Sequence, residues 1–341
     1  MHPFTKRLVL LAGCSGLAAA LLDISGMSIT PAFNAGTWQS TPVSTAALDF
    51  LADELAWQDR AEFRGRVLTL VLVDTREPVT TNDLEEVAYS WKRETGMEYR
   101  SLGFRWLHIP TLAPYGQLIS PVLDRATREF FGVPGDTWLR NLLTLRKYDE
   151  TLARMLGVRF VVSDSSLEEI GIPVKTVEEG SLTPLAIYEV TGSNTRGYSP
   201  TDYLVANNWT ATVAAIRAED FNPEHSVILE SAAAAKLPAD PGLVSVHESA
   251  ILKEGPALRV TATSPRTSLL VLPFEFSHCL RLDSIDVSTY PQPALLRSNG
   301  FLVGILFSGQ LNAVLTFDSS PVGLASCRLA DIDDWRRYYA A

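Results

Sequence analysis

The chain has 341 residues, which at roughly 150 residues per domain favours about two domains. Hydrophobic residues make up 46% and charged residues 20%, so the composition disfavours disordered and collagen-like chains and favours a buried core. Acidic residues outnumber basic residues by 39 to 29, and the net charge of −10 disfavours nucleic acid as a partner, because its phosphates require clustered positive charge.

The N-terminal segment contains the one long apolar run, residues 8–22, directly after Lys6 and Arg7. A many-spanning membrane protein needs about twenty apolar residues for each crossing, so that class is excluded for this chain. We expect residues 1–25 to form a single membrane anchor with its basic start in the cytoplasm. Two alternatives remain: a lipidation signal at Cys14 and a buried helix. Both membrane interpretations place the rest of the chain outside the cytoplasm.

Residues 26–45 are rich in Gly, Pro, Ser and Thr and lack apolar periodicity, so we expect a linker. Helical and strand patterns then mix over 46–195, which predicts a mixed α/β domain. The expected helices cover 46–59, 82–93, 118–131 and 138–156, and the expected strands cover 66–73, 158–163 and 185–190.

Turn-forming residues cluster at 192–200, which predicts a boundary to a second domain over 196–341. One helix is expected at 208–218. Short strands are expected at 226–230, 243–248, 257–263, 268–272, 280–284, 301–307 and 311–317. Ser308–Gln310 has the length of a hairpin loop between the last two strands. The predicted fold class is α+β, with a mixed domain followed by a jelly-roll-like β-sandwich.

Three cysteines occur, and Cys279 and Cys327 both lie in the β-rich region. In an oxidising compartment this pair predicts a disulfide, and the alternative is two buried thiols. No CxxC, HxxxH or HExxH spacing occurs, so we predict neither a metal site nor a cofactor.

Three stretches together resemble the extracytoplasmic tail of bacterial YfhO-type membrane proteins, a branch of the GT-C glycosyltransferases. They are an apolar helix with a Pro-containing linker (21–33), the strand entry at 152–162, and the strand at 268–274, with a motif-like segment at 109–115. In that family the catalytic acid and the lipid-linked donor site lie in the membrane part, which this chain lacks. The resemblance therefore implies a periplasmic module, held in the inner membrane by one helix, that works with a polytopic subunit or represents part of a larger enzyme.

Sugar sites combine aromatic faces with a few placed polar groups. The loop over 105–115 has this mixture, and we predict glycan contacts from Trp106, His108 and Tyr115. The alternative for the two aromatic residues is packing within the protein.

Glu275, Arg297 and Asn299 in the β-rich region are further candidates for glycan contact. A Glu beside a His can transfer protons, but Glu275 and His278 lie in opposite phases of a strand. The structural alternative at the other two residues is a turn, in which Asn299 adopts positive φ and Arg297 pairs with a carboxylate such as Asp283 or Asp286.

These patterns favour an accessory domain of a cell-envelope glycosyltransferase system, which binds or positions a glycan or lipid-linked acceptor and has no catalysis of its own. The rival enzyme hypothesis is an exported glycoside hydrolase that uses Glu275 and a second carboxylate. A third hypothesis is a scaffold of a membrane complex.

Overall fold

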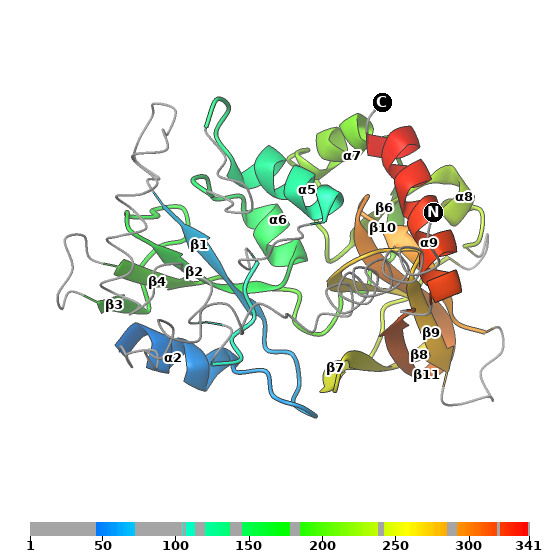
Figure 1. Cartoon of the computed structure of the whole chain (residues 1–341), viewed down its shortest axis with the longest axis horizontal. Helices are drawn as coiled ribbons and strands as arrows, with labels where there is room; N and C mark the ends of the chain where they lie inside the picture. The colour runs from blue at the N-terminus through cyan, green and yellow to red at the C-terminus, as the bar shows by residue number, and fades with distance from the viewer. Residues whose placement is uncertain are drawn as a thin grey trace, which may run out of the picture. The chain divides into compact units, whose positions relative to one another are not determined.

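The computed structural model describes residues 46–71, 104, 107–112, 120–136, 145–177, 185–237, 242–284, 292–318 and 321–339. The predicted anchor, the linker and the helix expected at 82–93 lie outside these ranges. In the described ranges, no helix is both long and apolar enough to cross a membrane. Helices and strands are combined, so the described chain is α+β (Figure 1).

The helices are α2 (Ala46–Leu55), α5 (Pro121–Phe131), α6 (Glu150–Met155), α7 (Trp209–Ile216), α8 (Ser231–Ala234), α9 (Pro321–Asp334) and the π-helix η2 (Trp335–Tyr339). The strands are β1 (Arg66–Leu70), β2 (Val158–Ser163), β3 (Lys175–Val177), β4 (Leu185–Glu189), β5 (Asp202–Val205), β6 (Ser226–Leu229), β7 (Glu248–Glu254), β8 (Ala257–Glu275), β9 (Leu280–Ser284), β10 (Ala294–Ser298) and β11 (Leu302–Phe317).

The first sheet has the order β1-β2-β4-β3, with β1 and β2 parallel and the other pairs antiparallel. Helix α2 covers one face and helices α5 and α6 cover the other (Figure 1). On the α2 face, Leu51 packs in one cluster with Val67 and Phe160. On the opposite face, Leu68 and Phe130 belong to the central core. Apolar residues on both sides explain why β1 reads as a continuous apolar run.

Helix boundaries follow their capping residues. Ser120 caps α5, so the helix predicted at 118–131 begins slightly later. The helix predicted over 138–156 is wrong at 145–149, where the chain is not helical. Asp149 caps α6 by accepting a 2.8 Å hydrogen bond from the Leu152 N–H, and an N-cap residue has non-helical backbone angles. Gly157 then turns the chain into β2 with φ 69°, where a Cβ would lie 2.8 Å from a backbone oxygen.

The largest sheet has five strands in the order β10-β11-β8-β7, with β9 also paired to β11. The short strands predicted at 257–263 and 268–272 are one strand, β8, and those at 301–307 and 311–317 are one strand, β11. The predicted hairpin at Ser308–Gln310 is therefore wrong. Gly309 has φ 77° and lies opposite three residues of β8, 264–266, so the register shift is a bulge in β8 and β11 continues through Gly309. The strand predicted at 243–248 is also wrong, because β7 begins at Glu248.

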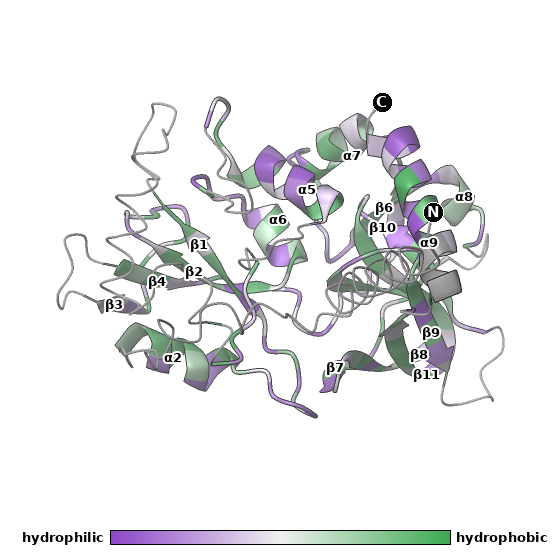
Figure 2. Ribbon diagram, viewed as in Figure 1, coloured by the Kyte–Doolittle hydropathy of each residue, from purple (hydrophilic) through white to green (hydrophobic). Residues whose placement is uncertain are grey.

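The long strands of this sheet contribute to two cores. In β8, Leu269 and Val271 belong to the central core, whereas Leu270 and Leu272 belong to a second cluster. That second cluster also contains Leu311 and other residues of β11. Figure 2 shows much of β1 and β11 in green, as expected for strands with buried faces, whereas α5 and α9 have both purple and green residues.

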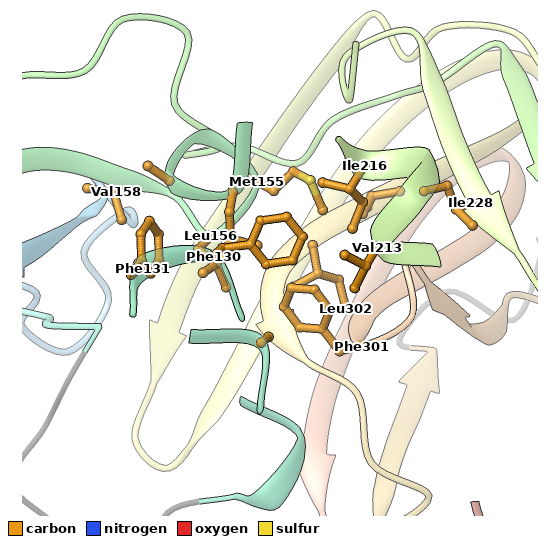
Figure 3. Packing of buried hydrophobic residues seen from close by; sticks show 14 of the residues in the cluster. Phe130, Phe131, Met155, Leu156, Val158, Val213, Ile216, Ile228, Phe301 and Leu302 are labelled. Carbon is orange, nitrogen blue, oxygen red and sulfur yellow. The ribbon is translucent and has the colours of Figure 1, made fainter. Parts of the chain in front are cut away.

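The central core joins elements that are distant in the sequence. Phe130 of α5, Met155 of α6, Val213 of α7 and Phe301 before β11 pack together (Figure 3). Residues from both sides of the predicted boundary at 195 contribute to this core, and the chain from Ser44 onward forms one compact unit. The division into two domains at that position stays a prediction.

Helix α9 and η2 are fixed to the rest of the unit by covalent and polar bonds. A disulfide joins Cys279 to Cys327, which is the first of the two alternatives for this pair. The Tyr338 hydroxyl shares a 2.5 Å hydrogen bond with Thr212 of α7, and the Tyr339 hydroxyl donates to the Gly300 carbonyl oxygen. The side chains of η2 therefore complete the central core.

Candidate functional site

The structure describes four of the six predicted glycan contacts. Trp106 and Tyr115 lie outside the described residues, as does the lipidation candidate Cys14. His108 is exposed with φ 56°, and its carbonyl oxygen accepts a 2.8 Å hydrogen bond from the Trp57 N–H. Glu275, Arg297 and Asn299 lie at the ends of β8 and β10, near α9 and η2.

Arg297 lies in a buried ion network. Its side chain is 9% exposed, its Nε donates to Glu230 at 2.8 Å, and its Nη1 lies 3.1 Å from Asp334. Its guanidinium carbon lies 4.6 Å from the Tyr338 ring centroid. Burial alone lowers the pKa of Arg297, but the nearby Tyr339 and the two carboxylates offset this effect and raise it. These carboxylates differ from the predicted Asp283, because the end of α9 brings Asp334 to this place, and the other predicted partner, Asp286, lies outside the described residues.

Asn299 has a structural role in the turn between β10 and β11. It adopts φ 51°, followed by Gly300 at φ 80°, as the structural alternative requires. The residue is 1% exposed, and its amide oxygen accepts a 2.8 Å hydrogen bond from the Ile228 N–H. The described contacts of Arg297 and Asn299 thus lie within the protein, and glycan contact by either stays a prediction.

Glu275 ends strand β8 and accepts a hydrogen bond from the Ser120 hydroxyl. Burial raises the pKa of Glu275 to about 7, with a further increase from Asp331 and an opposing effect of Ser120. Because β8 ends at Glu275, the alternation of side-chain directions predicted for residues 274–278 does not continue beyond it. Ser277 and His278 both reach α9, where the Ser277 hydroxyl donates to Asp331 at 2.7 Å and the His278 ring bonds Asp334.

A different feature forms a hollow on the surface: an open depression of about 660 Å³ over the outer face of the large sheet. It is lined by Glu62, Arg196, His247, Glu248, Ser249, Ala250, Thr261, Ala262, Thr263, Gln310, Leu311 and Asn312.

The floor of the hollow is built by strand register. Glu248 of β7 lies opposite Thr263 of β8, which lies opposite Gln310 of β11. Two residues along, Thr261 lies opposite Asn312. Side chains two apart along a strand share a face, so the polar groups form one row across three strands and a second row across β8 and β11, where Ala250 is the β7 member. The residues between them point inward to the second cluster.

Most polar side chains of the hollow have no hydrogen-bond or ionic partner among the described residues. The exception in this part of the chain is Asn312, whose amide oxygen accepts a 3.3 Å hydrogen bond from Nη1 of Arg259. Unpaired hydroxyl, amide and carboxylate groups bind hydroxyl-rich ligands by direct or water-mediated hydrogen bonds. Across the residues with assigned positions, no cluster of three or more His, Cys, Asp or Glu side chains could hold a metal ion.

Comparisons with known proteins add no relative: no protein-family model matches the chain, and no curated protein or solved structure matches it significantly.

The sequence analysis missed the hollow although a signal for it exists. Thr261, Thr263, Gln310 and Asn312 alternate with apolar residues, which is the period-two pattern of a strand with one solvated face. Interpreting Gln310 as part of a hairpin loop hid that pattern in β11. Glu62 and Arg196 come from loops, and no spacing in the sequence places them beside these strands.

Proposed function

We propose that this chain is an extracytoplasmic accessory module of a cell-envelope glycosyltransferase system. Residues 8–22 hold it at the bacterial inner membrane, and the β-rich part, a jelly-roll-like sandwich, binds or positions a glycan acceptor. A polytopic membrane subunit supplies the catalysis. The ordered resemblance to YfhO-type tails motivates this assignment.

The hollow is the observation on which the binding function rests. Its volume of about 660 Å³ falls within the usual range of ligand sites, and its polar rows can bond several hydroxyl groups at once. Its rim is open, which suits an internal segment of a chain-like ligand. The disulfide between Cys279 and Cys327 supports an oxidising compartment, where such bonds persist.

Titration calorimetry of the full chain with oligosaccharides released from bacterial envelopes tests the binding function. We expect binding that Gln310→Ala weakens about three- to tenfold, because one hydrogen bond is worth about 1 kcal/mol. Gln58→Ala is the matched control, since Gln58 is also exposed but does not line the hollow. Equal effects of the two variants, or no binding of any oligosaccharide, would refute the assignment.

Cell fractionation tests the anchoring. Deleting residues 1–25 should move the protein from the membrane fraction to the soluble cytoplasmic fraction, because the same segment also directs export. Recovery of the full chain in the soluble cytoplasmic fraction would contradict the proposed location.

One observation favours a second candidate, a glycoside hydrolase. Glu275 has a pKa raised to about 7, as a general acid requires, and the second carboxylate, Asp331, acts on it electrostatically. On this hypothesis the full chain hydrolyses an envelope glycan, and Glu275→Gln abolishes the activity without lowering binding in the hollow. Unchanged hydrolysis in that variant rejects Glu275 as the acid.

A further inference from the structure

The hollow is lined by more acidic side chains than Arg or Lys side chains. Glu62 and Glu248 contribute two carboxylates, whereas Arg196 contributes one guanidinium. All three residues are exposed, and none has an ion pair with another described residue. Each charge is therefore available to a ligand.

The three charged residues lie on the β7 side of the hollow. Glu248 begins strand β7, and Glu62 pairs with Leu252 of the same strand, in the segment that hydrogen-bonds to its outer edge. Arg196 is two residues before Tyr198, which pairs with Val271 on the same edge of β8 as β7, because β11 occupies the other edge. Two carboxylates and one guanidinium leave this side of the hollow with an excess of one negative charge.

Another basic side chain of the same sheet does not neutralise this side. Arg259 lies two residues from Thr261 on β8, but its guanidinium donates to Glu254 and to Asn312. The whole chain has a net charge of −10, which further disfavours polyanions near its surface.

We propose that the hollow prefers glycans with free, protonated amino groups over neutral glycans, and neutral glycans over uronic-acid glycans. This inference rests on the proposed glycan-binding function. An ammonium group donates charge-assisted hydrogen bonds to Glu62 and Glu248, whereas a uronate is repelled by two carboxylates and attracted by one guanidinium. For exposed charges the preference at each step is about fivefold.

The test uses the full chain and three oligosaccharides of equal length: a de-N-acetylated hexosamine oligomer, its N-acetylated form and a uronic-acid oligomer. Titration calorimetry is done at a pH at which the amines are protonated, at low and at high salt. We expect the amino oligomer to bind about fivefold more tightly than the acetylated one, the uronate to bind weakest, and salt to reduce both differences.

Amino-acid substitutions test whether Glu62 and Glu248 cause the preference for amino glycans. The double substitution Glu62→Gln and Glu248→Gln should weaken binding of the amino oligomer more than binding of the acetylated one. Glu219→Gln removes the same type of charge from an exposed position outside the hollow and should leave the order of affinities unchanged. Binding without an amino preference, or a preference that the double variant retains, overturns this inference alone. Failure of all three oligomers to bind overturns it together with the proposed function.

Discussion

Replacing Asp334 by alanine should strongly destabilise the protein, because this carboxylate joins α9 to the sheet. It accepts hydrogen bonds from Arg337 and from the His278 ring, and it lies 3.1 Å from Arg297. Its side chain is 11% exposed and that of Arg297 is 9% exposed, so water can hydrate the Arg297 guanidinium only slightly when the carboxylate is removed.

The magnitude follows from the buried cation. Removing one partner of a buried ion pair costs about 3–5 kcal/mol, because the remaining charge is left uncompensated. Arg297 keeps Glu230, which places the expected loss near the lower end, about 3 kcal/mol. Asp333→Ala is the matched control. Asp333 is the preceding residue, its side chain is 76% exposed, and its pairing with Arg336 at 3.7 Å is worth about 0–1 kcal/mol.

The loss should depend on pH with a defined sign. Burial alone raises the pKa of Asp334, but His278 and Arg297 offset this effect and hold the pKa below 3.8. A depressed folded-state pKa contributes stability that is present above the unfolded value and lost as pH falls through the folded value. The difference between the wild type and Asp334→Ala should therefore shrink below about pH 4.

Urea unfolding followed by tryptophan fluorescence measures both effects. The midpoint of Asp334→Ala should fall at unchanged slope at pH 7. The Asp334→Ala variant should lose neither less than about 1 kcal/mol of unfolding free energy nor the same amount as Asp333→Ala. Either result would refute the conclusion that this buried ion network holds α9 on the sheet.

Three further outcomes are expected. The raised pKa of Glu275, about 7, means that its stability contribution is present below the ordinary value of 4.5 and is lost as pH rises through 7. Urea midpoints of Glu275→Gln should therefore vary less between pH 4.5 and 8 than those of the wild type, and parallel profiles would contradict this. Breaking the Cys279–Cys327 bond, which closes a loop with a sequence separation of 48, should cost about 2–5 kcal/mol in the same assay, and unchanged midpoints after reduction would argue against the bond. Gly304→Ala should cost about 1–3 kcal/mol, since its Cβ would lie 2.3 Å from the Ser298 hydroxyl, and adding Ser298→Ala should restore part of this loss.

Local patterns predicted those parts of the fold that local physics decides. Apolar runs and capping residues located β1, β2 and β4, and the ends of α5 and α7 lie within a few residues of their predicted positions. The continuity of β8 was not predictable in this way, because Pro265 and Arg266 within it resemble a turn. Pairing with β11 keeps the strand continuous, and such pairing is a long-range property.

The candidate site depended on the same long-range information. Glu230 and Asp334 reach Arg297 from sequence separations of 67 and 37, so no motif could identify the network that occupies this residue. The hollow likewise requires the register of three strands. The residue types in it are ordinary for a solvated strand face, and only their alignment makes them a candidate site.

The position of η2 in the central core has a consequence for the order of folding. Tyr338 bonds Thr212 across a separation of 126 residues, and Tyr339 packs against the Trp209 ring at 5.6 Å between centroids. During synthesis, α7 emerges long before these two tyrosines and exposes an apolar surface that has no cover until they follow. Nascent chains of this protein are therefore expected to need protection from aggregation until residues 335–339 are available, and closure of the core is a late event in its biogenesis.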